Sequence, residues 1–420
     1  MTTAGHQAGS AIEGPAKGNL LVLASTYPRW RGDPEPGFVH ELCKRLTAAF
    51  EVTVVVPHAA GAARIEQMDG VNVRRFRYAP EFAETLVNDG GIVANLKRDR
   101  WKWLLLPGFF LASLLATIRA LRGSSISIIH AHWLIPQGLV AAVASMTVRA
   151  GCPPFVVTSH GADLFALRSP LFAVLKRFVI RRAATVSVVS RAMVPAMNAL
   201  SAKAPLVCSM GVDLDNRFVP SAEDLRSENE LLFVGRLVEK KGLRHLISAL
   251  PLIIRSKPDA VLCVAGFGPE ELQLRQQIEA LGLQDRVTFL GAVSQEALPT
   301  LYRRAAVMVA PFVQAGDGDQ EGLGLVAVEA IGCGCPVVLG NVAAASEVQS
   351  MAPDMVELTS VQPEALASAV IRQMDLRSRS ASLAALKSRF GWNAVAETYA
   401  HWLTQAANGP AKVAKEPGRG

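Results

Sequence analysis

Short apolar runs that end in polar or glycine-containing turns alternate along this chain with segments whose apolar residues recur at helical spacing. Residues 19–25 and 52–57 are two such runs, and the segment 38–46 between them carries its apolar residues on one helical face. Strands covered on both faces give continuous apolar runs of this kind, as in parallel sheets. The pattern predicts β-loop-α-β units, in which ligands bind where the strands end.

The same alternation continues along the chain, and 420 residues leave room for two domains. Further strands are predicted at 126–133, 155–159, 184–190, 231–236, 261–266, 287–293, 307–312 and 336–339. A polar, acidic segment at 219–230 is the predicted linker. We therefore expect an α/β fold with two doubly wound parallel sheets.

The stretch DQEGLGLVAVEAIG combines a loop, a helix start and two glutamates. If the helix begins near Leu323, its first turn offers unpaired N–H groups and the positive end of a helix dipole, which favour a phosphate. Gly322 and Gly324 let a ligand approach the backbone closely. The eight residues from Glu321 to Glu329 correspond to roughly 12 Å of helix rise, so two carboxylates could bind hydroxyls at opposite ends of a ligand. A nucleoside diphosphate sugar, with its phosphates between two groups of hydroxyls, has this layout.

The simpler alternative is that Glu321 caps the helix and Glu329 is a solvated surface residue. The sequence around Glu329, VAVEAI, argues against it, because an unpaired carboxylate is costly to bury among apolar side chains. Glu329 needs a partner, and a ligand hydroxyl would be one.

Polar residues at other strand ends suggest the rest of a site. Arg236 and Lys241 leave a predicted strand at a spacing that suits an anion, although two surface cations near a turn would look the same. Gly37 precedes the 38–46 helix and is either a point of close ligand approach or an ordinary turn glycine. His132 and His160 end two strands of one sheet, so we expect both to point towards one cleft, although a lone histidine after a strand is usually structural.

The stretch EGLGLVAVEAIGCGCPVV resembles the donor-site signature of glycosyltransferase family 4, retaining enzymes of the GT-B fold, here of the bacterial cell-surface or exopolysaccharide type. The resemblance extends from about Leu20 to Leu403. It departs from the family at 341–347, where many members have a glycine-rich turn before a glutamate. It implies two Rossmann-like domains that face a cleft. The expected division is a leader at 1–18, an acceptor-side domain at 19–218, a donor-side domain at 219–390, a helix at about 391–405 that packs back on the first domain, and a tail at 408–420.

The resemblance also implies roles for individual residues. His160, supported by Asp163, is expected to contact the donor sugar, Glu321 to bind the sugar, and Glu329 the ribose. The residues expected to take part in catalysis are His160, Glu321, Arg236 and Lys241. Those expected to bind the donor are Gly37, Arg236, Lys241, Gly266, Val293, Gly322, Leu323, Gly324, Leu325 and Glu329. Because no nucleophile-and-base pair stands out, catalysis is expected to rest on stabilising the departing diphosphate, with retention of configuration.

We expect no metal and no cofactor other than the nucleotide sugar as co-substrate. Asp317 and Asp319 form a D-x-D, which binds a divalent ion in glycosyltransferases of another fold, but Arg236 and Lys241 already supply positive charge. The six cysteines show neither a C-x-x-C pair nor histidines at metal-binding spacing, which fits a reducing cytoplasm. The first 18 residues lack the apolar region of a signal peptide.

Positive charge is concentrated in the first half of the chain. Residues 1–220 contain 24 lysines and arginines against 14 acidic residues, whereas the remainder contains 19 against 22. This asymmetry suggests an anionic partner such as a phosphate or a membrane surface, and no nucleic-acid module is recognisable.

The segment 97–118 places four of these basic residues next to two tryptophans and an apolar run. Lys97, Arg98, Arg100 and Lys102 surround Trp101 and Trp103. Because Pro107-Gly108 interrupts the run, we predict no membrane span. The segment is either a core helix with a solvated basic turn or an interfacial element at an anionic membrane.

The sequence thus predicts a glycosyltransferase of hexosyltransferase type that acts on a glycan or polyprenyl-linked acceptor. It is expected in the cytoplasm, either free or peripherally bound to the inner face of the cytoplasmic membrane. The alternatives are a nucleotide-sugar-binding protein without transfer activity, or an epimerase or hydrolase of the same fold. The donor base, the sugar, the linkage and the oligomeric state do not follow from the sequence.

Overall fold

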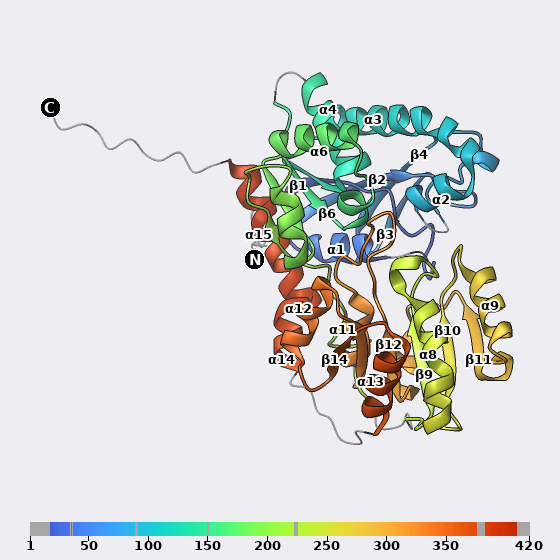
Figure 1. The fold of residues 1–420 in the computed structure, drawn as a ribbon. Coiled ribbons are helices and arrows are strands. Elements are labelled where there is room, and N and C mark those ends of the chain that lie inside the picture. Colours follow the sequence, from blue (N-terminus) through green and yellow to red (C-terminus); the bar gives the residue numbers. More distant parts are fainter. Residues whose placement is uncertain are drawn as a thin grey trace, which may run out of the picture.

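A computed structural model describes residues 17–33, 35, 37–88, 91–148, 151–221, 226–375 and 383–409. Nearly all of the predicted leader and tail, and residues 222–225 of the predicted linker, lie outside this part of the chain. Figure 1 shows two α/β domains, one above the other, with the last helix running along the first domain.

The first domain is built on an eight-stranded sheet in the order β3-β4-β2-β1-β5-β6-β7-β8. Its strands are β1 (Gly18–Leu23), β2 (Phe50–Pro57), β3 (Ile65–Met68), β4 (Val71–Phe76), β5 (Ile128–His132), β6 (Phe155–Ser159), β7 (Thr185–Val188) and β8 (Leu206–Val207). Its helices are α1 (Phe38–Leu46), α2 (Ile92–Arg98), α3 (Leu105–Gly123), α4 (Leu139–Thr147), α5 (Ala162–Phe165), α6 (Pro170–Arg182) and α7 (Val194–Asn198). All pairings are parallel except that of β3 with β4.

Each face of the first sheet is buried under a different set of helices. Leu21 and Leu23 belong to a core shared with α3, α4 and α6, whereas Leu20 and Val22 belong to a core shared with α1 and the last helix. Neighbouring residues of one strand therefore point into opposite cores. For this reason the strands appear in the sequence as unbroken apolar runs.

The second domain has a six-stranded, fully parallel sheet in the order β11-β10-β9-β12-β13-β14. Its strands are β9 (Glu230–Val234), β10 (Val261–Ala265), β11 (Val287–Gly291), β12 (Val307–Ala310), β13 (Val337–Gly340) and β14 (Val356–Thr359). Its helices are α8 (Leu243–Ser256), α9 (Glu271–Ala280), α10 (Leu298–Arg304), α11 (Leu325–Gly332), α12 (Ala343–Met351), α13 (Pro363–Asp375) and α14 (Leu383–Phe390). This is the strand order of a dinucleotide-binding sheet, whose ligands bind where the order reverses, between β9 and β12.

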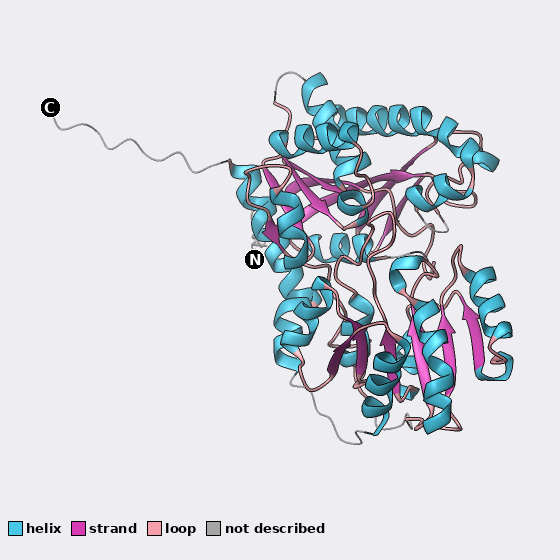
Figure 2. Cartoon of the chain, viewed as in Figure 1, coloured by secondary structure: helices cyan, strands magenta, loops and turns pink. Residues whose placement is uncertain are grey.

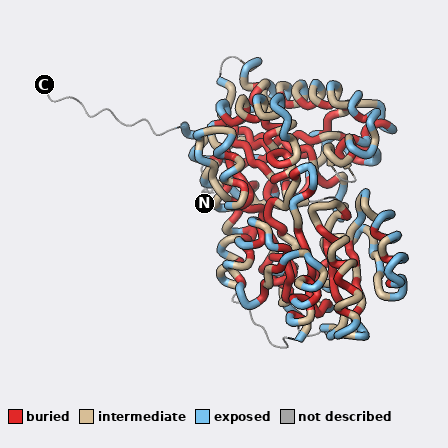
Figure 3. The backbone as a smooth tube through the Cα atoms, viewed as in Figure 1, coloured by how far each residue is buried: buried red, intermediate tan, exposed pale blue. Residues whose placement is uncertain are grey.

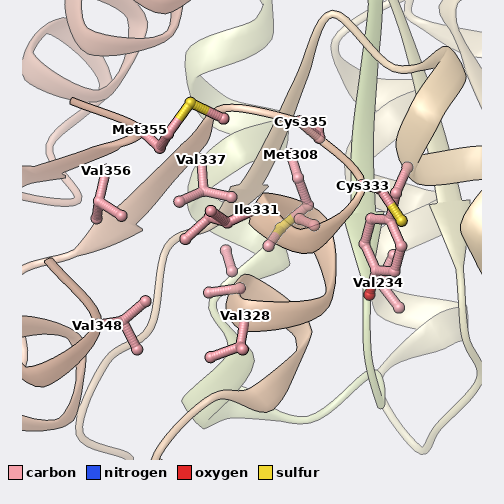
Figure 4. Close-up of a cluster of buried hydrophobic side chains, with 14 of the residues drawn as sticks. Val234, Met308, Val328, Ile331, Cys333, Cys335, Val337, Val348, Met355 and Val356 are labelled. Carbon is pink, nitrogen blue, oxygen red and sulfur yellow. The ribbon is translucent and has the colours of Figure 1, made fainter. Parts of the chain in front are cut away.

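Helix α11 lies at the centre of the second domain's larger core. Val328 and Ile331 of this helix pack against Met308 of β12 and Val337 of β13, and all four side chains are fully buried (Figure 4). Figure 3 shows the same contrast along the whole chain, with buried backbone at the sheets and exposed backbone at the outer helices. The position of α11 is thus fixed by packing on strands that end at the cleft.

The chain crosses between the domains twice, at adjacent places. Val212 forms a bridge with Gly391, and its N–H donates to the carbonyl of Phe390 at 2.7 Å. Helix α15 (Trp392–Asn408) then returns along the first domain (Figure 2). Tyr399 of this helix is buried and donates to the carbonyl of Cys208 at 3.1 Å. The predicted helix at about 391–405 therefore begins at Trp392 and continues to Asn408.

Some short elements differ from the predictions. The sequence pattern missed β3, β4, β8 and β14, and β8 rather than β7 is the last strand of the first sheet. Strand β8 contains only two residues, too few to form a pattern.

The prediction that Pro107-Gly108 interrupts the apolar segment was wrong. Both residues lie in the first turn of α3, where proline is tolerated because its missing N–H would have no helical partner. Together with the preceding 3₁₀ turn, a helical stretch of 24 residues from Arg100 to Gly123 is long and apolar enough to cross a membrane by length and composition. It nevertheless contacts β2, β4 and α4, as a helix that covers the first sheet does.

The crossing suggests a test of stability. A Cβ atom added at Gly211 would lie 2.3 Å from the ring of Trp392, so Gly211→Ala should lower the free energy of unfolding by about 1–3 kcal/mol through overpacking. Gly123→Ala is the control, because no atom lies within 4 Å of its added Cβ. Urea unfolding of both variants measures the effect; equal midpoints for the two would show that α15 is not held against this crossing.

Candidate active site

The loop between β12 and α11 lies against the first domain. Ser190 donates to the carbonyl of Gly322 at 2.5 Å, Arg168 donates to the carbonyl of Gly318 at 2.9 Å, and Lys97 forms an ion pair with Asp317. The loop therefore joins the two domains across the cleft, at the point where the second sheet reverses its strand order.

Helix α11 begins at Leu325, two residues later than the predicted start at Leu323. Gly324 precedes it with φ +81°, and a Cβ at this position would lie 2.7 Å from the Phe312 ring. The loop thus extends to Gly324, and Leu323 is a buried loop residue. Because only part of the segment from Glu321 to Glu329 is helical, the estimate of 12 Å from helix rise does not apply.

Glu321 forms an ion pair with Lys241 at 2.8 Å and accepts a hydrogen bond from the N–H of Gly324 at 3.2 Å. Burial by itself would raise the pKa of Glu321, but the charges of Lys241 and Lys240, with these hydrogen bonds, outweigh it and lower the pKa to about 2. Glu321 is therefore ionised at neutral pH. The ammonium of Lys241 also lies 4.9 Å from the ring centroid of Phe312.

Glu329 has the partner that its burial among apolar side chains requires, and in the structure this partner is a protein hydroxyl. The hydroxyl of Tyr302 donates to Oε2 of Glu329 at 2.8 Å. Burial raises the pKa of Glu329 to about 7, while the Tyr302 hydrogen bond and the nearby Lys241 act in the opposite direction. The two glutamates therefore have opposite environments, one paired with a cation and one held by a neutral donor.

Arg236 follows β9 and approaches the same region. Its Nε is buried without a hydrogen-bond partner among the described residues. Burial lowers the pKa of its guanidinium, whereas Glu35 and Asp319 act to raise it. A buried donor of this kind is rare in folded proteins and would be satisfied by an anion.

Three predicted donor-binding residues frame this region. Gly266 has φ +148°, and a Cβ there would lie 1.9 Å from the carbonyl of Gly235, so the two loops touch through their backbones. Gly37 precedes α1 with φ −88°, which any residue can adopt, so its geometry does not separate the two interpretations of this glycine. Val293 is partly buried after β11.

The aspartates of the D-x-D sequence are paired with lysines. Asp317 pairs with Lys97, and Asp319 pairs with Lys240 at 3.0 Å. Within the described ranges, no group of three or more histidine, cysteine, aspartate or glutamate side chains is arranged to hold a metal ion. Independence from a metal remains a prediction.

His160 and His132 do not both face the cleft, which corrects the sequence-based expectation. His132 is fully buried behind His160, and Nδ1 of His132 lies 2.9 Å from Nε2 of His160. His160 also packs on Trp133 and Phe38, with ring centroids at 4.8 and 5.1 Å. Burial lowers the pKa of His160 to about 3, so its ring is neutral at physiological pH.

Asp163 organises the turn that carries His160. Its carboxylate accepts hydrogen bonds from the N–H of Leu134 at 2.7 Å, the hydroxyl of Ser159 at 2.9 Å and the N–H of His160 at 3.2 Å. The supporting role expected for Asp163 therefore has a structural basis. A Cβ on Gly322 would lie 3.0 Å from the carbonyl of His160, so this turn touches the α11 loop directly.

The structure thus brings Arg236, Lys241, Glu321 and the start of α11 together, with His160 across the loop. Sequence reasoning missed Tyr302 and Phe312. No spacing signal links Tyr302 to a glutamate 27 positions away, and Phe312 reads as the end of a buried strand.

Two family descriptions match the two domains separately. Residues 38–210 match the glycosyl transferase 4-like domain, and residues 218–387 match glycosyl transferases group 1. The chain is 30% identical over 342 residues to the GDP-mannose-dependent alpha-(1-6)-phosphatidylinositol monomannoside mannosyltransferase of Mycolicibacterium smegmatis. The aligned region covers 78% of this chain and 82% of that protein. It is 27% identical over 234 residues to the N-acetyl-alpha-D-glucosaminyl L-malate synthase of Bacillus anthracis, covering 53% of this chain and 59% of that protein.

Solved structures share the fold at lower identity. Sucrose-phosphate synthase from Thermosynechococcus elongatus superimposes with a TM-score of 0.70 at 21% identity, covering 93% of this chain and 99% of that one. The Anabaena protein HepE in complex with UDP-glucose gives a TM-score of 0.68 at 20% identity, covering 92% and 99%. The GT-B fold predicted from the sequence is confirmed.

The neutral state of His160 can be measured. Because burial holds its pKa near 3, the ring resonances of His160 should not shift between pH 5 and 8 in a histidine-labelled sample. The signal is assigned by its loss in His160→Asn. A titration of that signal with a midpoint near 6.5 would contradict the neutral state of the ring.

Proposed function

The chain belongs to the glycosyltransferases of family 4 type, and we propose that it transfers a hexose, with retention of configuration, from a nucleoside diphosphate hexose to an acceptor held at a membrane. Its activity as a glycosyltransferase follows from the family. The donor, the acceptor and the stereochemistry are proposals, as is a place at the inner face of the cytoplasmic membrane in cell-surface glycan or glycolipid synthesis.

The buried Nε of Arg236, which has no hydrogen-bond partner among the described residues, is the observation that carries the donor site. It belongs to a strand tip next to Lys241, whose charge is already shared with Glu321. The N-terminus of α11 adds unpaired N–H groups to the same region. A diphosphate would satisfy all three groups, and a sugar beyond it would meet Glu321 and His160.

The chemistry then depends on charge stabilisation. As the bond between sugar and diphosphate breaks, negative charge develops on the leaving oxygen, which Arg236, Lys241 and the start of α11 would stabilise. The neutral ring of His160 can form a hydrogen bond with a sugar hydroxyl, but it carries no positive charge that would stabilise the leaving group. The acceptor hydroxyl attacks from the face that the diphosphate leaves.

GDP-mannose is the first donor to test. The mannosyltransferase with 30% identity is described as GDP-mannose-dependent and as acting on a phosphatidylinositol mannoside, so we infer a related donor and a lipid-borne acceptor here. UDP-hexoses are the second set of donors to test, because the structure of HepE contains UDP-glucose.

The outer face of α3 supports a membrane-borne acceptor. A single stripe along the helical stretch exposes Leu104, Leu111 and Leu115, which are 82%, 58% and 41% exposed. Exposed arginines flank the apolar centre of this stripe, with Arg100 before it and Arg119 after it. A helix with an exposed apolar stripe and cations beside it suits the interface of an anionic bilayer.

The half-exposed rings of Trp101 and Trp103 lie at the start of the stripe. The basic residues proposed from the sequence need revision, however. Lys102 is buried and pairs with Asp99 at 2.9 Å, and Lys97 is engaged by Asp317, so the stripe's own arginines are better candidates for contact with lipid.

The proposed reaction is tested by following release of GDP from GDP-mannose, and of UDP from UDP-hexoses, with and without membrane lipid extract as acceptor. Release that requires the acceptor, and that continues in excess EDTA, is the expected result. Release without any acceptor would indicate hydrolysis, and activity that EDTA abolishes and Mg²⁺ or Mn²⁺ restores would return Asp317 and Asp319 to consideration as ligands.

Arg236→Ala should reduce transfer strongly. Loss of one electrostatic donor to the leaving group costs about 2–4 kcal/mol of transition-state stabilisation, with little change in melting temperature. Arg255→Ala, an exposed arginine at the end of α8, is the matched control. Wild-type kcat/KM in both Arg236→Ala and Lys241→Ala would rule out this diphosphate site.

Flotation with anionic vesicles tests the membrane face. The wild type should float at low salt and dissociate as salt rises, because each arginine near the surface contributes about 1 kcal/mol. Leu111→Glu combined with Leu115→Glu should abolish flotation, whereas Leu272→Glu on α9, where the leucine is 69% exposed, should not. Equal flotation of the two variants would leave α3 as an ordinary surface helix.

A further inference from the structure

The carboxylate of Glu329 has one oxygen engaged and one free. Oε2 accepts the hydrogen bond from Tyr302, and Oε1 forms none with the described residues. Among the described residues, the fully buried side-chain nitrogen and oxygen atoms without a hydrogen-bond partner belong to His130, His132, Gln137 and Arg236. Oε1 of Glu329 is not one of them. Glu329 keeps 9% of its surface exposed, so Oε1 is the oxygen that a ligand hydroxyl would contact.

We propose that Tyr302 is a positioning residue for the donor's ribose, holding one oxygen of Glu329 so that the other accepts hydrogen bonds from the ribose hydroxyls. This inference rests on the proposed function, in which Glu329 binds the ribose. Tyr302 itself touches the carboxylate and not the donor.

The geometry leaves Tyr302 little freedom. Tyr302 belongs to α10, and its side chain is fully buried. Its ring packs edge to face on Phe218, with the ring centroids 6.1 Å apart. Burial raises the pKa of Tyr302 well above its ordinary value, so the phenol keeps its proton and donates. The carboxylate therefore faces a donor in a fixed position.

No other side chain in the described structure replaces this contact. The titratable or charged groups near Glu329 are Tyr302 and Arg303 of α10, Arg217 before β9, Lys241 before α8, and Cys333 and Cys335 after α11. Arg303 donates to the carbonyl of Val219 at 2.8 Å, and Lys241 pairs with Glu321.

The elements packed on α11 add no further group. Its neighbours β12 and β13 carry no titratable residue. On α14, Lys387 pairs with Asp215 at 2.9 Å, and Arg389 pairs with Glu347 at 2.8 Å.

Loss of the hydroxyl would act through the ionisation of Glu329. Burial raises the pKa of Glu329 to about 7, and the Tyr302 hydrogen bond is the first effect that opposes this rise. Without it, the pKa rises further, and the protonated carboxyl accepts ribose hydroxyls less well. Binding would then need a higher pH, since a hydrogen bond to a charged group corresponds to about one to two pH units.

The experiment measures binding of GDP, UDP and their 2′,3′-dideoxy forms from pH 6 to 9 by calorimetry. In Tyr302→Phe, binding of the ribonucleotide should weaken about ten- to hundredfold at pH 7 and recover towards wild type near pH 9. The dideoxy forms should bind wild type and Tyr302→Phe equally. Glu329→Gln should bind weakly at every pH, because an amide does not ionise.

Tyr78→Phe is the matched control, a buried tyrosine of the first domain whose hydroxyl accepts from the N–H of Leu86. A Tyr302→Phe loss that is the same at all pH values, or that extends to the dideoxy forms, would overturn the inference in favour of a packing role. An unchanged profile would overturn it as well. Failure of the wild type to bind either nucleotide would instead overturn the proposed donor site.

Discussion

The loop that enters α11 lies against the first domain and has no room for a side chain at Gly322 or Gly324, and the site depends on this constraint. At Gly324 a Cβ would meet the ring of Phe312, and at Gly322 it would meet the carbonyl of His160. The close backbone contact brings the positive end of α11 to the cleft. It also places Glu321, which directly precedes Gly322, within ion-pair distance of Lys241, which follows the neighbouring strand β9.

The electrostatics of the site follow from where each carboxylate sits relative to that loop. Glu321 is held in its charged form by a lysine, and Glu329 lies deeper, beside a phenol, where charge is less favourable. Two chemically identical groups eight residues apart thus acquire different ionisation behaviour from their surroundings alone, a common way for one fold to assign different tasks to similar side chains.

The fold was largely predictable because its strands are buried on both faces and therefore give apolar runs that are visible without any alignment. The loop and helix at residues 319–332 were visible for the same reason, as glycines and acids inside an apolar stretch. What could not be predicted were contacts between distant segments. The burial of His132, the Tyr302 hydrogen bond and the pairing of Lys97 with Asp317 are all set by packing, and none has a local sequence signature.

The two crossings between the domains lie next to each other, at Val212 and Gly391, beside α12 and α14. Helix α2 lies at the opposite side of the molecule (Figure 1). The two covalent links lie along one edge, so if the domains rotate about that edge, the displacement grows with distance from it. The contact of Glu347 with the N–H of Arg191 lies beside that edge and would change least. The ion pair of Lys97 with Asp317 lies far from that edge, so such a rotation would separate it before the contacts beside the crossings.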